Sequence, residues 1–228
     1  MIHIEHFTFN AFQERTLLVW DNEGFCAFVD PGFSNAAERD ELTGFVAQKG
    51  LKPVCIMLTH AHFDHIYGVA ELANTYNVPI YMHQREKHTL DVTNPYLCKA
   101  FGLPVPEQFS WTETSAEGDN SSESSRIKVG SLEFEVIETP GHTPGGVCFL
   151  ERNEKVLISG DTLFAGAIGR TDHPGGDYDL LMRSIFEKLM GLDGDITVIP
   201  GHGPDTSIAD ERMTNPFLMP FNEPYEEK

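Results

Sequence analysis

Four short apolar runs in this sequence each end in a cluster of histidine, aspartate or glycine. The clusters are His60-Ala61-His62-Phe63-Asp64-His65, Gly141-His142, Gly160-Asp161-Thr162 and Gly201-His202-Gly203. The run before the first cluster, residues 54–58, is apolar throughout, which is typical of a strand buried on both faces. In α/β sheets, functional groups gather at the carboxyl ends of the strands. The chain is therefore expected to place each of these clusters at the end of a strand.

The pattern around the clusters predicts an α/β protein. Apolar or alternating runs predict strands at 2–9, 16–20, 24–30, 54–58 and 78–82, and again at 131–138, 146–150, 155–159 and 196–199. Helical spacing predicts helices at 66–76 and at about 177–190, and a further helix that Asn35 begins and Gly50 ends. Strands followed by a helix occur twice, at 1–76 and 131–190. This repetition indicates two similar halves packed face to face.

Residues 84–126 interrupt this pattern. The stretch contains three prolines and four aromatic side chains, followed by a polar run from 112 to 125. We expect residues 117–125 to form an exposed loop, because the run is rich in serine and acidic residues. The aromatic part fits either a satellite core or a cap over a pocket. The whole chain, 1–228, is expected to be one domain with this insertion.

Composition excludes several classes of partner. The 228 residues hold 16 lysines and arginines against 35 aspartates and glutamates, a formal net charge of −19. Such an excess of carboxylates argues against binding to nucleic acid or to an anionic membrane surface, since both need basic residues. No run approaches the ~18 apolar residues of a membrane-spanning helix. We therefore expect a small-molecule partner.

The cysteines and the start of the chain predict the compartment. Four scattered cysteines, at positions 26, 55, 98 and 148, are typical of reduced thiols. The first residues lack the basic segment and apolar run of a secretory signal. We expect a cytoplasmic protein that is a monomer or a small homo-oligomer.

The four clusters together offer five imidazoles and two carboxylates. Such nitrogen and oxygen donors suit a borderline divalent cation such as zinc, iron or manganese. A tetrahedral structural site needs four donors, whereas seven suffice for two adjacent metals that share one carboxylate and keep an open position. The remaining histidines are interpreted as ordinary surface or core residues: His3, His6, His83, His88 and His173. For His173 its neighbours in the sequence leave a second interpretation open, which is given below.

The sequence resembles the metallo-β-lactamase-fold hydrolases in residues 59–65, 139–145, 160–164 and 200–203. The resemblance implies a four-layer αβ/βα sandwich of two mixed β-sheets flanked by helices. It also implies a division of the seven donors between two metals. The first metal is held by His60, His62 and His142, and the second by Asp64, His65 and His202, with Asp161 as the bridge.

Within that superfamily, residues 161–177 are similar to the glyoxalase II-type branch and to its persulfide dioxygenase relatives. The stretch after His202 is too short for the C-terminal helical domain of full-length glyoxalase II, so the resemblance is to the short, single-domain enzymes. It implies hydrolysis of a small acyl thioester of the S-lactoylglutathione type by a metal-bound hydroxide. The cofactors are then two divalent metal ions, Zn²⁺ with iron or manganese as alternatives. The resemblance also implies that Asp64 ligates a metal, and we expect it to orient the nucleophile.

The loop after Asp161 supplies candidate substrate-binding residues. Arg170 is able to hold a substrate carboxylate bidentately, or to pair with Asp172 or Asp177 and fix the loop. His173 and Tyr178 lie beside it in the sequence and are expected at the rim of the pocket.

Other activities remain open at this point. A persulfide dioxygenase would use one Fe(II) at His60, His62 or His142, and Asp161, with open positions for oxygen and thiolate. A lactonase and a non-catalytic metal-binding protein are further alternatives. A secreted β-lactamase and a nuclease of the same fold are disfavoured, the first by the missing secretory signal and the second by the acidic charge.

Overall fold

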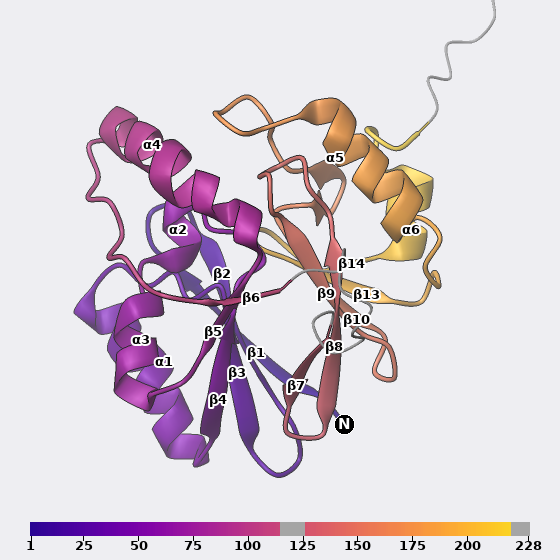
Figure 1. The fold of residues 1–228 in the computed structure, drawn as a ribbon. Helices are drawn as coiled ribbons and strands as arrows, with labels where there is room; N and C mark the ends of the chain where they lie inside the picture. Colours follow the sequence, from indigo (N-terminus) through magenta and orange to yellow (C-terminus); the bar gives the residue numbers. More distant parts are fainter. Residues whose placement is uncertain (115–125, 220–228) are drawn as a thin grey trace, which may run out of the picture.

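The computed structural model describes residues 1–114 and 126–219, and its centre is a pair of six-stranded sheets (Figure 1). The first sheet has the order β1 (His3–Phe9), β2 (Glu14–Trp20), β3 (Phe25–Val29), β4 (Lys52–Met57), β5 (Ile80–Met82) and β6 (Thr112–Glu113). Its first three strands are antiparallel, and β3 to β6 are parallel.

The second sheet has the order β14 (Thr206–Ser207), β13 (Thr197–Pro200), β10 (Val156–Gly160), β9 (Val147–Glu151), β8 (Leu132–Glu138) and β7 (Arg126–Val129). Here β10 and β13 are parallel and the other neighbours are antiparallel. A short hairpin, β11 (Leu163–Phe164) and β12 (Ala167–Ile168), follows β10. Both sheets are therefore mixed, as predicted.

Alternation of side chains along the strands creates the layers. In β3, Cys26 and Phe28 belong to the outer core under the helices, whereas Ala27 and Val29 belong to the core between the sheets. Because successive side chains of a strand point to opposite faces, a strand buried on both faces is apolar throughout. Helices α1 (Ala36–Lys49) and α3 (Val69–Tyr76) cover the first sheet, and α5 (Tyr178–Ser184) and α6 (Ile208–Thr214) cover the second (Figure 1). The predicted four-layer sandwich is confirmed.

Local capping fixes where the predicted helices begin and end. The side chain of Asn35 accepts hydrogen bonds from the N–H groups of Ala37 and Glu38, and Gly50 ends α1 with a left-handed φ of 64°. Asp177 accepts from the N–H of Leu180 and caps α5. Each cap satisfies donors that a helix end otherwise leaves unpaired.

The helix predicted at 66–76 is two helices in the structure. Helix α2 (Phe63–Ile66) starts three residues earlier than expected, and α3 follows after a break at Gly68. A Cβ atom at Gly68 would lie 2.3 Å from Cε1 of Phe33, because the Phe33 ring packs directly against this backbone. The helix predicted at 177–190 ends its regular part at Ser184 and continues as a π-helical turn, Ile185–Leu189.

The segment after β5 is more ordered than the sequence suggested. It contains a 3₁₀ turn (Gln84–Glu86), a π-helical turn (Thr89–Thr93) and helix α4 (Asn94–Phe101), and then joins the first sheet as β6. Phe109 and Trp111 pack against the outer core, whereas Phe101 is half exposed. The loop expected at 117–125 lies outside the described residues.

Two further observations concern the described residues, 1–114 and 126–219. No helix there is both long and apolar enough to cross a membrane. All four cysteines are buried and carry free thiols.

Candidate metal centre

Seven side chains from the predicted clusters gather where strands of both sheets end. His60 and His62 lie in the loop after β4, and the short helix α2 carries Asp64 and His65. The other three follow β8, β10 and β13: His142, Asp161 and His202. The structure thus brings together all seven donors that the sequence indicated.

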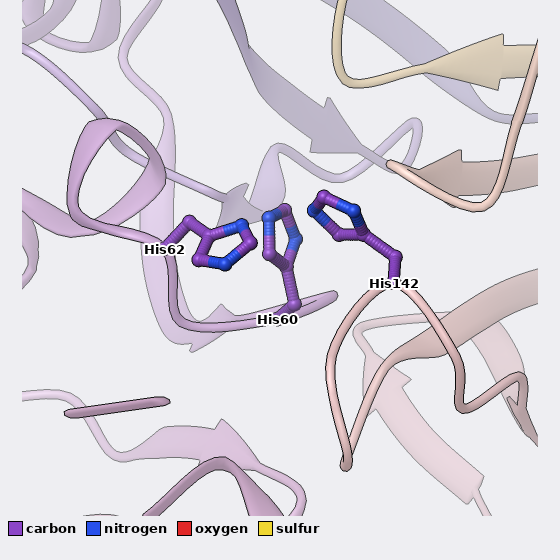
Figure 2. Close-up of side chains that lie close together, drawn as sticks. All are labelled: His60, His62 and His142. Carbon is purple, nitrogen blue, oxygen red and sulfur yellow. The ribbon is translucent and has the colours of Figure 1, made fainter. Parts of the chain in front are cut away.

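Three of these histidines face one another, as Figure 2 shows. One nitrogen each from His60, His62 and His142 lies within 4.8 Å of the others. The Nε2 atoms of all three are buried and lack a hydrogen-bond partner among the described residues. A buried polar atom without a partner costs about 1–3 kcal/mol, so three at one point fit a ligand that accepts their lone pairs.

A second group of donors lies beside the first. Ligand atoms of Asp64, His65 and His202 also lie within 4.8 Å of one another. Nε2 of His202 is 3.5 Å from Oδ2 of Asp64, and the Nε2 atoms of His65 and His202 are 3.2 Å apart. A carboxylate with two imidazoles is a donor set that divalent transition metals accept.

Asp161 reaches both groups. Its Oδ2 is 3.5 Å from Nε2 of His142 and 3.7 Å from Nε2 of His202, while its Oδ1 is 3.5 Å from Nε2 of His65. Gly201 packs against this carboxylate, since a Cβ atom there would lie 2.5 Å from Oδ1 of Asp161. Only a glycine leaves Asp161 in its present position between the two groups.

Hydrogen bonds at the far side of the rings set their orientation. Nδ1 of His142 lies 2.7 Å from the carbonyl oxygen of Arg170, which can only accept, so Nδ1 carries the proton and Nε2 presents its lone pair. Nδ1 of His65 lies 3.3 Å from Oδ2 of Asp30. Such outer contacts are typical of metal-binding histidines, because they fix the tautomer and the ring plane.

The two groups differ in their electrostatics. Burial lowers the pKa of His62 well below its usual range and that of His142 to about 4, so both are neutral near pH 7. Burial would also lower the pKa of His65, but the carboxylates of Asp161, Asp64 and Asp30 outweigh it and raise that pKa. When no metal ion is bound, the positive charge that balances the buried carboxylates of the second group therefore comes from a protonated imidazole. This site requires positive charge, which metal ions supply.

The donors open into a cavity of about 490 Å³. Asp64, Asp161, His62 and His202 line its polar side. The rest of the wall is largely apolar and includes Phe12, Phe63, Leu97, Phe101, Phe164 and Ile168. A mostly apolar cavity with a few convergent polar groups is typical of a small-molecule site.

Two of the three predicted substrate residues line the cavity, and the third does not. Arg170 lines the cavity and forms a bidentate pair with Asp172, at 2.8 and 2.9 Å, rather than with Asp177. His173 also lines it, with its ring 4.6 Å from that of His62 and with Nε2 buried and unpartnered among the described residues. Tyr178 is half exposed at the first residue of α5 and is not among the residues that line the cavity.

Two buried carboxylates that support the centre were not identified from the sequence. Asp30 accepts hydrogen bonds from the backbone N–H and the hydroxyl of Thr59, and it contacts His65. Glu86 accepts from the backbone N–H groups of Ala61 and Gly145, which lie in two different metal-site loops. Asp30 is the last residue of the strand predicted at 24–30 and directly follows β3 in the structure, so the rule that located the four clusters would have found it. Glu86 carries no such signal, because only the folded chain brings it to these loops.

Comparisons with known proteins agree with this geometry. The sequence profile of the Metallo-beta-lactamase superfamily matches residues 10–202. The chain is 36% identical over 220 residues to hydroxyacylglutathione hydrolase GloC of Haemophilus influenzae, a match that covers 95% of this chain and 98% of that protein. The BLEG-1 B3 metallo-beta-lactamase has a TM-score of 0.85 at 33% identity, over 96% of this chain and 100% of the other. TTHA1623 in a di-iron-bound form has a TM-score of 0.80 at 34% identity, over 94% and 100%. This chain therefore belongs to the metallo-β-lactamase superfamily, a family of metal-dependent hydrolases.

Proposed function

We propose that this protein is a dinuclear metal-dependent hydrolase of small acyl thioesters, similar to glyoxalase II. The observation that carries the proposal is the position of Asp161, whose two carboxylate oxygens approach one donor group at His142 and the other at His65. A carboxylate shared in this way suits two adjacent cations rather than one. The similarity to a hydroxyacylglutathione hydrolase supports a thioester as the substrate.

In this proposal the first metal is held by His60, His62 and His142, and the second by Asp64, His65 and His202. Asp161 bridges them. Zn²⁺ is the proposed ion, with iron or manganese as alternatives, because the donors are imidazole and carboxylate without thiolate. When bound, the two cations supply Lewis-acid chemistry and make a water nucleophile available near neutral pH.

The side chains around the centre have defined tasks. The buried carboxylate of Asp64 orients the attacking water and holds its proton; His65 and His202 outweigh the effect of burial and lower the pKa of Asp64, so it is ionised. The water oxygen bonds to the carbonyl carbon, the carbon–sulfur bond breaks, and sulfur leaves with the bonding electrons as thiolate. Since a thiolate is stable near neutral pH, no strong general acid is needed at the leaving group.

Three further roles are part of the proposal. Nε2 of His173 makes a hydrogen bond to the substrate, because this residue lines the cavity and its buried Nε2 has no partner among the described residues. Arg170 and Tyr178 act at the rim, where Arg170 stays paired with Asp172 and holds the loop that carries His173. Helix α4 caps the cavity through Leu97 and Phe101.

Metal content tests the dinuclear site. Protein purified without added metal or chelator is expected to hold two equivalents of metal per chain by elemental analysis. His142→Gln is expected to reduce this to about one equivalent, whereas His6→Gln, which changes an exposed histidine, keeps two. One equivalent in the unchanged protein would contradict the dinuclear proposal.

Activity tests the reaction class. The fully metallated protein is expected to hydrolyse a panel of acyl thioesters, and a chelator is expected to abolish turnover until metal is restored. A single iron with oxygen consumption on glutathione persulfide would instead identify a persulfide dioxygenase. A lactonase would show turnover on lactones without any on thioesters, and failure on every substrate would indicate a non-catalytic metal-binding protein.

A further inference from the structure

We infer that the cavity selects thioesters whose thiol part is apolar and uncharged over thioesters of glutathione. This inference rests on the thioester hydrolase function proposed above and adds the substrate class. Two features of the cavity carry it. One is an aromatic wall that is assembled from three distant segments, and the other is the pairing of its arginine, Arg170, with Asp172.

The aromatic wall consists of Phe12, Phe63 and Phe101. Phe12 lies between β1 and β2, Phe63 begins α2 and Phe101 ends α4, yet the three rings contact one another. Phe12 meets Phe63 edge to face at 5.0 Å and Phe101 at 5.4 Å between ring centroids. Aromatic rings hold neighbouring apolar groups through contact area and preferred edge or offset geometry.

A second part of the cavity wall is apolar as well. Phe164 and Ile168 of the β11–β12 hairpin line the cavity beside the metal side. Phe101 is 51% exposed, so a large apolar surface faces solvent at the cavity until a ligand covers it. An apolar group in the cavity gains burial against these side chains.

The charges of the cavity and of the whole chain also disfavour thioesters of glutathione. Glutathione carries two carboxylates and one ammonium near neutral pH, and recognition of carboxylates uses arginine or lysine. Among the described residues that line the cavity, Arg170 is the one arginine or lysine, and Asp172 already holds it bidentately. The chain as a whole has a net charge of −19. A thiol with two carboxylates and a net negative charge therefore finds no dedicated cation here and approaches a molecule of like charge.

A pair of substrates with the same acyl group tests the selection directly. S-lactoylglutathione is compared with the lactoyl thioester of benzyl mercaptan on the fully metallated protein. We expect kcat/KM to be on the order of 10-fold or more higher for the benzyl ester, the scale of discrimination that apolar pockets provide. A higher kcat/KM for the glutathione ester overturns the inference while the thioester function stands.

Two variants locate the effect. Phe101→Ser is expected to raise KM for the benzyl ester several-fold, and by more than it raises KM for the glutathione ester. Phe186→Ser is a matched control, because Phe186 is 49% exposed but lies outside the residues that line the cavity. Equal effects of the two variants on the benzyl ester contradict the assigned wall.

A binding measurement keeps this test separate from the proposed function. Thioether analogues of both esters, with CH₂ in place of the carbonyl group, are titrated calorimetrically into the metal-free protein. Tighter binding of the benzyl analogue, weakened by Phe101→Ser, supports the selection even if no thioester is cleaved and the proposed function fails. Tighter binding of the glutathione analogue, lost in Arg170→Met, overturns it.

Discussion

Glu86 joins the two loops that carry the first group of histidines, and its removal is expected to loosen both. The side chain is fully buried, and its two oxygens accept from the N–H of Ala61 at 2.7 Å and from the N–H of Gly145 at 2.8 Å. Ala61 lies between His60 and His62, and its carbonyl oxygen accepts from the side chain of Asn94 at 2.8 Å. The segment after β5 thus holds both peptide groups of this loop residue.

The loss can be estimated from these contacts. Glu86→Ala leaves two buried N–H groups unpaired, at about 1–3 kcal/mol each. The free energy of unfolding is therefore expected to fall by about 2–6 kcal/mol. For a chain of this size each kcal/mol lowers Tm by roughly 2–4 °C, so the fall in Tm is on the order of 10 °C. Glu86→Gln keeps one acceptor oxygen and is expected to lose about half as much.

The assay is thermal unfolding together with metal content per chain. Besides the fall in Tm, Glu86→Ala is expected to lose the metal of the His60, His62 and His142 group first. Glu187→Ala changes an exposed glutamate on the far side of the second sheet and is expected to stay within about 0.5 kcal/mol of the unchanged protein. A Tm of Glu86→Ala equal to that of this control, with full metal content, would refute the reasoning.

Three further predictions follow from the centre. Gly201→Ala places a Cβ atom 2.5 Å from Oδ1 of Asp161 and should lower metal content and kcat at least about 10-fold. The control is Gly44→Ala in α1, where a Cβ atom meets no other atom within 4 Å; it should raise the free energy of unfolding by about 0.5–1 kcal/mol with activity unchanged. Removal of metal by a chelator should lower Tm, because a ligand at 1,000 times its Kd stabilises the folded state by about 4 kcal/mol; an unchanged calorimetric Tm would show that no tight metal site exists. In metal-free protein, burial lowers the pKa of His142 from 6.5 to about 4. As the pH drops, the unfolded chain therefore takes up a proton at this histidine before the folded protein does. The free energy of unfolding then falls between pH 6.5 and pH 4, by on the order of 3 kcal/mol. His142→Gln should remove that part of the decline, and equal declines for both proteins would count against this ionisation.

The strand ends could be predicted from the sequence because their signal is local. Each of four apolar or alternating runs is followed by polar residues, and the structure places those residues at the ends of β4, β8, β10 and β13. Helix caps at Asn35 and Asp177 are local in the same sense, since the cap and its donors lie within three residues. The break between α2 and α3 is different, because it depends on the Phe33 ring packing on Gly68 from another part of the chain. The spacing of apolar residues within 63–76 therefore could not predict the break.

The same distinction separates the metal donors from the substrate pocket. The donors can be named from short motifs because each cluster is contiguous in the sequence and a strand end fixes its position. The pocket wall has no motif, since Phe12, Phe63 and Phe101 meet only when the first hairpin, α2 and α4 have packed together. A change in α4 can therefore alter which group the cavity accepts without touching a metal donor. The effect of Phe101→Ser on KM, measured against an unchanged metal content, tests that independence.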